Sequence, residues 1–196
     1  MVFNGTFHQN LDLTSAYYAN LTFSGIFLGN LSAPISCTFS GLTVYGNLYE
    51  MGQSNWGGVT VYGNLTSNCQ NSWPDDISSC TIYGDASMTN SAGQNNSFSG
   101  GIYYGSVTTD NTCLISGGTY YGSASSGTNI SGGDFYGSVA WGSPNYQYFI
   151  PGGFLSGTVH NIVPTVSNGK TTTTFGGITL ISASVPQLDV LSLGLG

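Results

Sequence analysis

The feature that most constrains the fold of this chain is a phrase that it repeats. The pattern Ile-Ser-Gly-Gly-X-(Tyr/Phe)-Tyr-Gly-Ser-(Ala/Val) begins at Ile115 and again at Ile130. Its Tyr-Gly pair recurs every 15 to 21 residues, in about eight copies over residues 20–160. Self-similarity of this kind is typical of repeat architectures. The pairs are Tyr45-Gly46, Tyr62-Gly63, Tyr83-Gly84, Tyr104-Gly105, Tyr121-Gly122 and Tyr136-Gly137, with Leu28-Gly29 and Ser156-Gly157 as degenerate outer copies.

Two apolar positions flank each pair, one directly before the Tyr and one three residues after it. Four residues separate them, so on an extended strand they share a face, while the Tyr points to the other face. Each copy is therefore predicted to form a strand of about five residues. The first column is Phe27, Val44, Val61, Ile82, Tyr103, Tyr120, Phe135 and Leu155, and the second is Leu31, Leu48, Leu65, Ala86, Val107, Ala124, Val139 and Val159.

A second short apolar element precedes most of these strands and is followed by Gly or by Pro-Gly. Gly permits positive φ, so we expect a brief strand, a tight corner and then the main strand. The apolar residues of this element are Phe23, Phe39, Phe98, Ile115, Ile130 and Ile150.

A constant core with loops of varying length predicts an all-β fold, a single-stranded β-solenoid of about eight coils. One coil cannot bury its own apolar face, so the phrase is repeated until neighbours cover each other. The alternative is an antiparallel sandwich or barrel in which each copy is a hairpin arm. Residues 1–19 are expected to form an N-terminal cap or attachment segment, residues 20–160 the solenoid, and residues 161–196 a C-terminal β cap or subunit-exchange segment.

The phrases FSGGIYYGSV, ISGGTYYGSA and ISGGDFYGSV resemble the repeats of β-solenoid proteins in viral fibres, tail-spikes and microbial surface proteins. The resemblance covers about two thirds of the chain. It implies a non-enzymatic structural protein on the exterior of a virus particle, a fibre, spike or decoration subunit that mediates display and host attachment. The expected location is the virion surface or the extracellular space. The alternatives are a cell-surface adhesin or extracellular filament subunit, and a glycan-degrading tail-spike enzyme.

Charge is scarce in this sequence. Only 5% of residues are charged, Lys170 is the single Lys or Arg, and the formal net charge is −7. One cation cannot neutralise many phosphates, so nucleic acid and anionic lipid are excluded as partners. We also expect no signal peptide and no membrane insertion, since no apolar stretch is long enough. A surface of hydroxyls and amides suits an exterior protein, and equally a lineage-wide composition bias.

The Tyr residues of the pairs are predicted to form an outward ladder, because like positions of successive coils lie about 4.8 Å apart. Stacked rings suit a strip that binds carbohydrate or an apolar partner, or an interface between identical chains at the axis of a homotrimer, which we favour. The expected partners are copies of the chain itself, other virion or surface proteins and host-surface glycan. The ladder residues are Tyr45, Tyr62, Tyr83, Tyr104, Tyr121 and Tyr136.

The loops 49–57, 66–79 and 140–149 are predicted to contact the host or the next subunit through Trp56, Trp73, Trp141 and Tyr146. Two sequons after the corner Gly, at Asn30 and Asn64, are candidate glycosylation sites.

The four cysteines include no Cys-X-X-Cys pair, which argues against zinc. Cys69 and Cys80 flank one loop and are a candidate disulfide. Cys37 and Cys113 hold equivalent places four coils apart, roughly 19 Å in a straight stack, and this exceeds the ~7 Å Cα limit for a disulfide.

The main enzymatic candidate is Asp75 with Asp76, adjacent acids beside Trp73. Adjacent acids in such a loop ordinarily form a turn. We therefore expect no catalytic residue, no metal site and no cofactor.

Overall fold

The computed structural model describes most of the repeat region and the strands that follow it. Beyond residue 137 it describes strands but not their side chains. The described residues are 1–16, 20–70, 74–90, 96–110, 112–126, 130–137, 139–141, 158–159, 162–167, 170–175 and 178–182. None of them forms a helix, and so none forms a helix able to cross a membrane.

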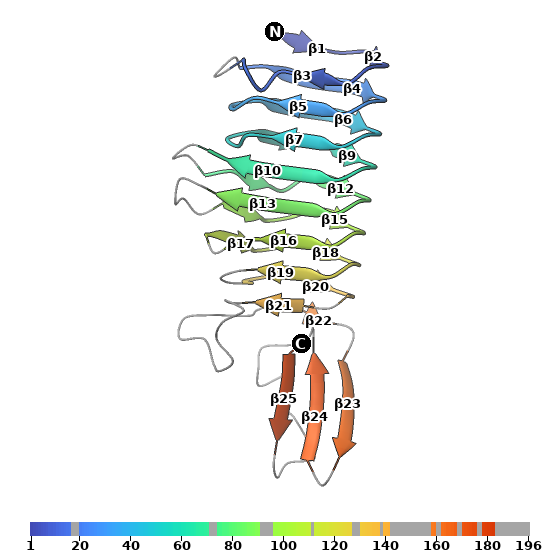
Figure 1. Ribbon diagram of the computed structural model, residues 1–196, viewed down its shortest axis with the longest axis vertical. Coiled ribbons are helices and arrows are strands. Elements are labelled where there is room, and N and C mark those ends of the chain that lie inside the picture. Colours follow the sequence, from blue (N-terminus) through green and yellow to red (C-terminus); the bar gives the residue numbers. More distant parts are fainter. Residues whose placement is uncertain are drawn as a thin grey trace.

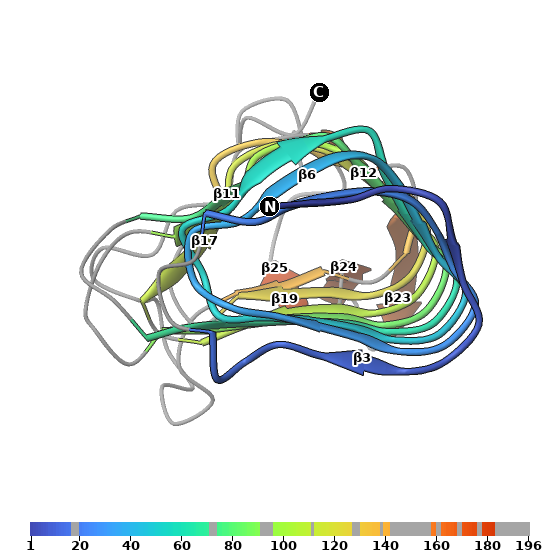
Figure 2. The same cartoon turned by 90° about the horizontal axis from the view of Figure 1, so that it is seen from above.

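Three parallel sheets wrap around a common core (Figures 1 and 2). Sheet A contains β1 (Val2–Phe3), β2 (Thr6–Phe7), β4 (Thr22–Phe27), β6 (Thr38–Val44), β8 (Asn55–Gly57), β9 (Val59–Val61), β12 (Cys80–Ile82), β15 (Ile102–Tyr103), β18 (Thr119–Tyr120), β20 (Asp134–Phe135) and β22 (Thr158–Val159). Sheet B contains β3 (Leu11–Asp12), β5 (Leu31–Ala33), β7 (Leu48–Glu50), β10 (Leu65–Cys69), β13 (Ala86–Asn90), β16 (Val107–Thr109), β19 (Ala124–Ser126) and β21 (Val139–Trp141). Sheet C contains β11 (Asp76–Ile77), β14 (Asn96–Phe98) and β17 (Cys113–Ile115).

Every pairing in these three sheets is parallel and joins successive coils, as in Leu65↔Leu48 and Leu65↔Ala86. The fold is therefore a single-stranded β-solenoid of about seven turns, close to the eight copies expected. The solenoid prediction is confirmed. The antiparallel sandwich is excluded for the repeat region, since hairpin arms would pair in opposite directions.

The predicted apolar columns line the interior. Each described member from Phe27 to Phe135, and from Leu31 to Ala124, is at most 1% exposed. The third column is also inward, with Phe23, Phe39, Phe98, Ile115 and Ile130 buried. Its corner glycines take positive φ as expected, for example 95° at Gly101 and 104° at Gly118.

The predicted five-residue strand is wrong in one respect. Each phrase is two short strands, one in sheet A and one in sheet B, and the chain bends between them at Tyr-Gly. For example, β9 ends at Val61 and β10 begins at Leu65. Both flanking residues still point inward, because the bend replaces the flat strand without changing the alternation.

The two ends of the chain add further detail, while the role of residues 1–19 as a cap or attachment segment stays a prediction. Residues 1–16 already belong to the coil, since β1 and β2 pair with β4 and β3 pairs with β5. At the other end Val159 pairs with Phe135, so the register predicted for the last copy, with Leu155 in that column, is wrong. Beyond the last coil in Figure 1, β23 (Ile162–Ser167), β24 (Lys170–Phe175) and β25 (Ile178–Ser182) form a separate antiparallel sheet.

Candidate functional sites

The outward tyrosines form the predicted ladder. Its six side chains, Tyr45, Tyr62, Tyr83, Tyr104, Tyr121 and Tyr136, are 38 to 50% exposed. Successive rings are stacked, with centroids 4.7 to 5.1 Å apart and interplanar angles of 2 to 18°. Five intervals of about 4.8 Å make a strip roughly 24 Å long, whose accessible parts are ring edges and phenol oxygens. This is the largest repeated apolar feature among the exposed side chains that the structure describes.

The corner that carries each Tyr is held by glycine and by an amide ladder. A Cβ added at Gly63 would lie 2.5 Å from the Gly46 carbonyl oxygen, so consecutive corners approach too closely for any side chain. The side chain of the residue after each Gly accepts a hydrogen bond from a backbone N–H of the following coil. The Asn47 N–H donates to Asn30 Oδ1, and the Asn64 N–H donates to Asn47 Oδ1, both at 2.8 Å. Because the close glycine contact and the amide hydrogen bond recur in successive coils, the Tyr side chains are held at the same spacing.

Asn30 and Asn64, the candidate glycosylation sites, belong to this amide ladder. Both are exposed, and the side-chain oxygen of each accepts a backbone N–H, from Asn47 and Asp85 respectively. Glycosylation of either residue stays a prediction.

The predicted contact loops fare differently. Trp56 lies in strand β8 and not in a loop; it is half-buried, pairs with Phe39 and packs on the core with ring centroids 4.9 Å apart. Its contact with a host or a neighbouring subunit stays a prediction. Trp141 lies in strand β21. Trp73 and Tyr146 fall outside the described residues.

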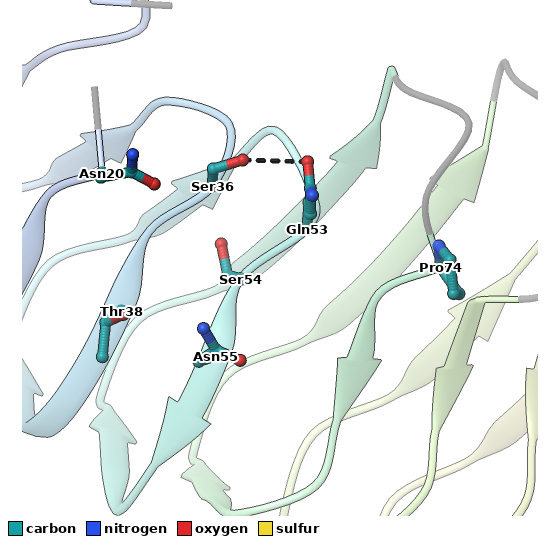
Figure 3. Close-up of a pocket in the computed structure, with 7 residues that line it drawn as sticks. All are labelled: Asn20, Ser36, Thr38, Gln53, Ser54, Asn55 and Pro74. Carbon is teal, nitrogen blue, oxygen red and sulfur yellow. Dashed lines mark hydrogen bonds between the residues drawn. The ribbon is translucent and has the colours of Figure 1, made fainter. Parts of the chain in front are cut away.

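A polar pocket opens beside the early coils (Figure 3). It has a volume of about 300 Å³ and carries no charged side chain. Ser36 donates a hydrogen bond of 2.9 Å to Gln53 Oε1 across two coils, as the dashed line in Figure 3 marks. The lining residues are Asn20, Ser36, Thr38, Gln53, Ser54, Asn55 and Pro74.

Backbone conformation sets this pocket apart. Asn20, Ser36 and Gln53 have φ of 46°, 66° and 59°, and they are the non-glycine residues with positive φ in the described part of the chain. All three line the pocket. Residues other than Gly adopt such backbone angles at a cost in conformational energy, and residues strained in this way are concentrated at ligand-binding and functional sites.

Directly behind Ser54 lies a buried acidic cluster. Ser54 donates its backbone N–H to Asp75 Oδ1 at 3.0 Å and its hydroxyl to Glu50 Oε2 at 3.2 Å. Glu50 and Asp75 are 0% and 1% exposed, and Cys69 and Ser67 beside them are fully buried. Ser54, only 8% exposed, therefore separates the pocket from two buried carboxyl groups.

The electrostatics of the cluster follow from its burial. Burial raises the pKa of Asp75 well above its usual value, and the neighbouring Glu50 charge raises it further. The hydrogen bond from the Ser54 N–H opposes this shift in the pKa. Burial and the neighbouring carboxyl therefore both favour the protonated form of Asp75, unless a cation compensates for the charges.

The Asp75–Asp76 pair considered from the sequence is not a pair in space. Asp75 is buried in the core, whereas Asp76 is exposed and accepts a hydrogen bond of 2.8 Å from Ser97 Oγ. Adjacent residues of an extended segment point to opposite faces. The partner of Asp75 is Glu50, one coil away. The alternation of β7 directs Glu50 inward, although the sequence predicts a loop over residues 49–57.

The cysteines are four buried thiols. The disulfide suggested between Cys69 and Cys80 is absent, since Cys69 lies beside Ser67 Oγ and Cys80 donates to Tyr103 Oη at 3.3 Å. Cys37 and Cys113 are both buried and form no disulfide, as expected. Burial raises the pKa of the Cys80 thiol to about 11 and those of Cys37 and Cys113 to about 12, which keeps all three protonated at neutral pH.

Fold and site together define the class of the chain as a parallel β-solenoid with an exposed tyrosine ladder. Comparisons with protein-family models, with curated proteins and with solved structures found no match.

Proposed function

We propose that this chain is a non-enzymatic structural protein on the exterior of a virus particle, a fibre, spike or decoration subunit for display and host attachment. The solenoid serves as a shaft, and the tyrosine ladder is the face along which copies of the chain associate, most simply as a homotrimer. The exposed ladder is the observation that carries the proposal, and the repeat resemblance supports the assignment to a virion.

A second copy of the chain suits the ladder because it has the same axial period. Rings spaced 4.7 to 5.1 Å apart repeat at the strand spacing of any parallel solenoid. The rings of two or three such strips can lie in register along their full length, whereas a globular partner contacts only a few rings. Tyr is also enriched at protein interfaces, where its ring is buried and its hydroxyl reaches a polar rim.

The scarcity of charge points the same way. Among the described residues that flank the Tyr-Gly pairs and are not buried, most are Asn, Ser or Thr, and Asp85 is one of the few acids. Association along the strip therefore desolvates few charges, which removes the main penalty against burying it.

The test is the mass of the chain in solution. Light scattering and small-angle scattering are expected to give an elongated trimer, and the variant Tyr62→Ser/Tyr83→Ser/Tyr104→Ser is expected to be monomeric at the same concentration. The control Thr43→Ala/Thr60→Ala/Thr81→Ala alters the neighbouring outward column of sheet A and should leave the trimer intact. A wild-type monomer, or a ladder variant that stays folded and trimeric, contradicts the proposed association.

Location is tested separately with an antibody against the chain. Labelling of virus particles in the producing culture is the expected result. Labelling confined to the cell envelope would favour the alternative, an adhesin or filament subunit.

The polar pocket supports the attachment role. Its amides and hydroxyls, with no charge, match the hydroxyl groups of a neutral glycan better than an ionic ligand. Binding on a glycan panel is expected to fall at least tenfold in Asn55→Ala and to persist in Thr66→Ala, which lies on the outward face of β10. Equal binding by both variants would remove the pocket from the proposal.

A further inference from the structure

Three side chains able to bind a metal ion meet in the core behind the pocket. Glu50 ends β7, Cys69 ends β10 and Asp75 precedes β11, so they come from two successive coils. One ligand atom from each lies within 4.8 Å of the other two, and all three residues are at most 1% exposed.

Among the described side chains, none is a positively charged partner of this cluster. The chain has a single Lys and no Arg, and Lys170 lies in β24 of the C-terminal sheet. Isolated carboxylates are expensive to bury, and they ordinarily occur paired with a cation or a metal. A proton or a metal ion must therefore make up the deficit.

One oxygen of the cluster has no donor. Glu50 Oε2 accepts hydrogen bonds from the Gly52 N–H at 2.5 Å and from Ser54 Oγ, whereas Glu50 Oε1 is fully buried with no hydrogen-bond donor. Asp75 is its carboxyl neighbour, and the two bond to each other only when one is protonated. An unsatisfied buried acceptor is a costly feature to retain without a ligand.

The Cys69 thiol distinguishes a metal from a proton. A proton shared by two carboxyls needs no sulfur, but a thiolate with carboxylates is a donor set that zinc accepts. We propose that Glu50, Cys69 and Asp75 bind one divalent transition-metal ion of the zinc class.

The geometry requires only small adjustments. Ligand atoms of a tetrahedral zinc site lie roughly 3.3–3.6 Å apart, so side-chain movements of about 1 Å bring the cluster into range. Ser54 lines the pocket and donates its hydroxyl to Glu50 Oε2, so under this proposal the ion would enter from the pocket side and take a water as its fourth ligand. The ion links the coil of β7 to the coil of β10 and so acts as a staple inside the solenoid.

The wild-type chain tests the site directly. After treatment with a chelator, titration with Co²⁺ is expected to saturate at one ion per chain and to give a thiolate-to-metal charge-transfer band and the visible spectrum of tetrahedral Co²⁺. X-ray absorption of the Zn²⁺-loaded chain should show one sulfur at about 2.3 Å with oxygens at about 2.0 Å. Sub-stoichiometric binding, or a shell without sulfur, overturns the proposal and leaves a carboxyl pair that shares a proton.

Variants assign the ligands. Cys69→Ser is expected to abolish the charge-transfer band, and Glu50→Gln and Asp75→Asn to weaken Zn²⁺ binding by more than about a hundredfold, since even outer-shell partners are worth 10–100-fold. Asp76→Asn and Cys80→Ala are the matched controls, an exposed acid and a buried thiol outside the cluster, and should bind as the wild type does. Unchanged binding in all three ligand variants contradicts the assignment. Should a ligand variant fail to fold, the stoichiometry and sulfur shell of the wild type still decide the question.

Discussion

Glu50 is the residue that breaks the pattern of the core. Its column in sheet B contains Ala33, Ser67 and Met88, all small or apolar and all fully buried. The alternation of apolar and polar residues predicted most of the interior, because burial of one face follows directly from the period of two. The alternation missed Glu50 and Asp75, because an acidic residue is expected on the exposed face. The two come from different coils, so only the folded structure shows that they lie side by side.

Two buried phenols give a prediction at alkaline pH. Tyr103 and Tyr120 point inward and donate to the carbonyls of Gly100 and Gly117, and burial raises the pKa of each well above its usual value. A raised pKa in the folded state means that the stabilisation is complete below the unfolded value near 10 and is lost as pH rises above it. The loss is about 1.4 kcal/mol per pH unit for each phenol.

The double variant Tyr103→Phe/Tyr120→Phe should therefore lose less stability than the wild type when urea unfolding is compared between about pH 9 and about pH 11. Phe135 already follows Tyr120 in the stack at 4.9 Å, so the ring itself fits, and each lost hydrogen bond should cost about 1 kcal/mol at neutral pH. Tyr83→Phe on the exposed ladder is the control. An identical pH slope in the double variant and the wild type would show that these phenols do not govern alkaline stability.

At the scale of the element, the corner matters more than the strand. The Tyr-Gly phrase identified which residues face inward, but not that the chain bends there between two sheets. The reason is physical: a bend that leaves both flanking residues inward has the same alternation as a straight strand. The fixed Gly was the available signal, because its missing side chain lets successive corners touch through Gly63 N–H to the Gly46 carbonyl at 3.1 Å.

Gly63→Ala tests the corner. The added Cβ would lie 2.5 Å from the Gly46 carbonyl oxygen and 2.7 Å from its carbon, both backbone atoms of the adjacent coil. Overpacking against backbone should lower the free energy of unfolding by about 3 kcal/mol. In Gly57→Ala the nearest atom is the Phe39 carbonyl oxygen at 3.2 Å, so a loss within about 1 kcal/mol is expected there. Equal losses in chemical denaturation would mean that corner contact is not what retains the glycine.

At the scale of the whole molecule, the repeat predicted the coil because parallel stacking is the arrangement that places like residues in register. It failed at the last copy, where Val159 and not Leu155 follows Phe135. The residues near Ser156-Gly157 resemble the repeated phrase only loosely, so the sequence does not fix their register. The pairing of β22 with β20 sets it instead. The antiparallel sheet of β23, β24 and β25 lies outside the repeat altogether, and no periodicity in the sequence indicated its strand order.

A solenoid in which each coil contacts only its neighbours should tolerate the loss of one whole coil but not of half. Deletion of residues 105–121 joins Tyr104 to Gly122 and restores every column: Ala124 then follows Ala86, and Ile130 follows Phe98. The shortened chain should keep its β circular dichroism, shorten by about 4.8 Å along its axis in small-angle scattering, and unfold at a lower denaturant concentration. Deletion of residues 105–113 instead places Leu114 at a corner that admits only Gly, and should abolish cooperative unfolding. If both deletions unfold alike, neighbour-only stacking is not the source of stability, and long-range closure between the ends must be.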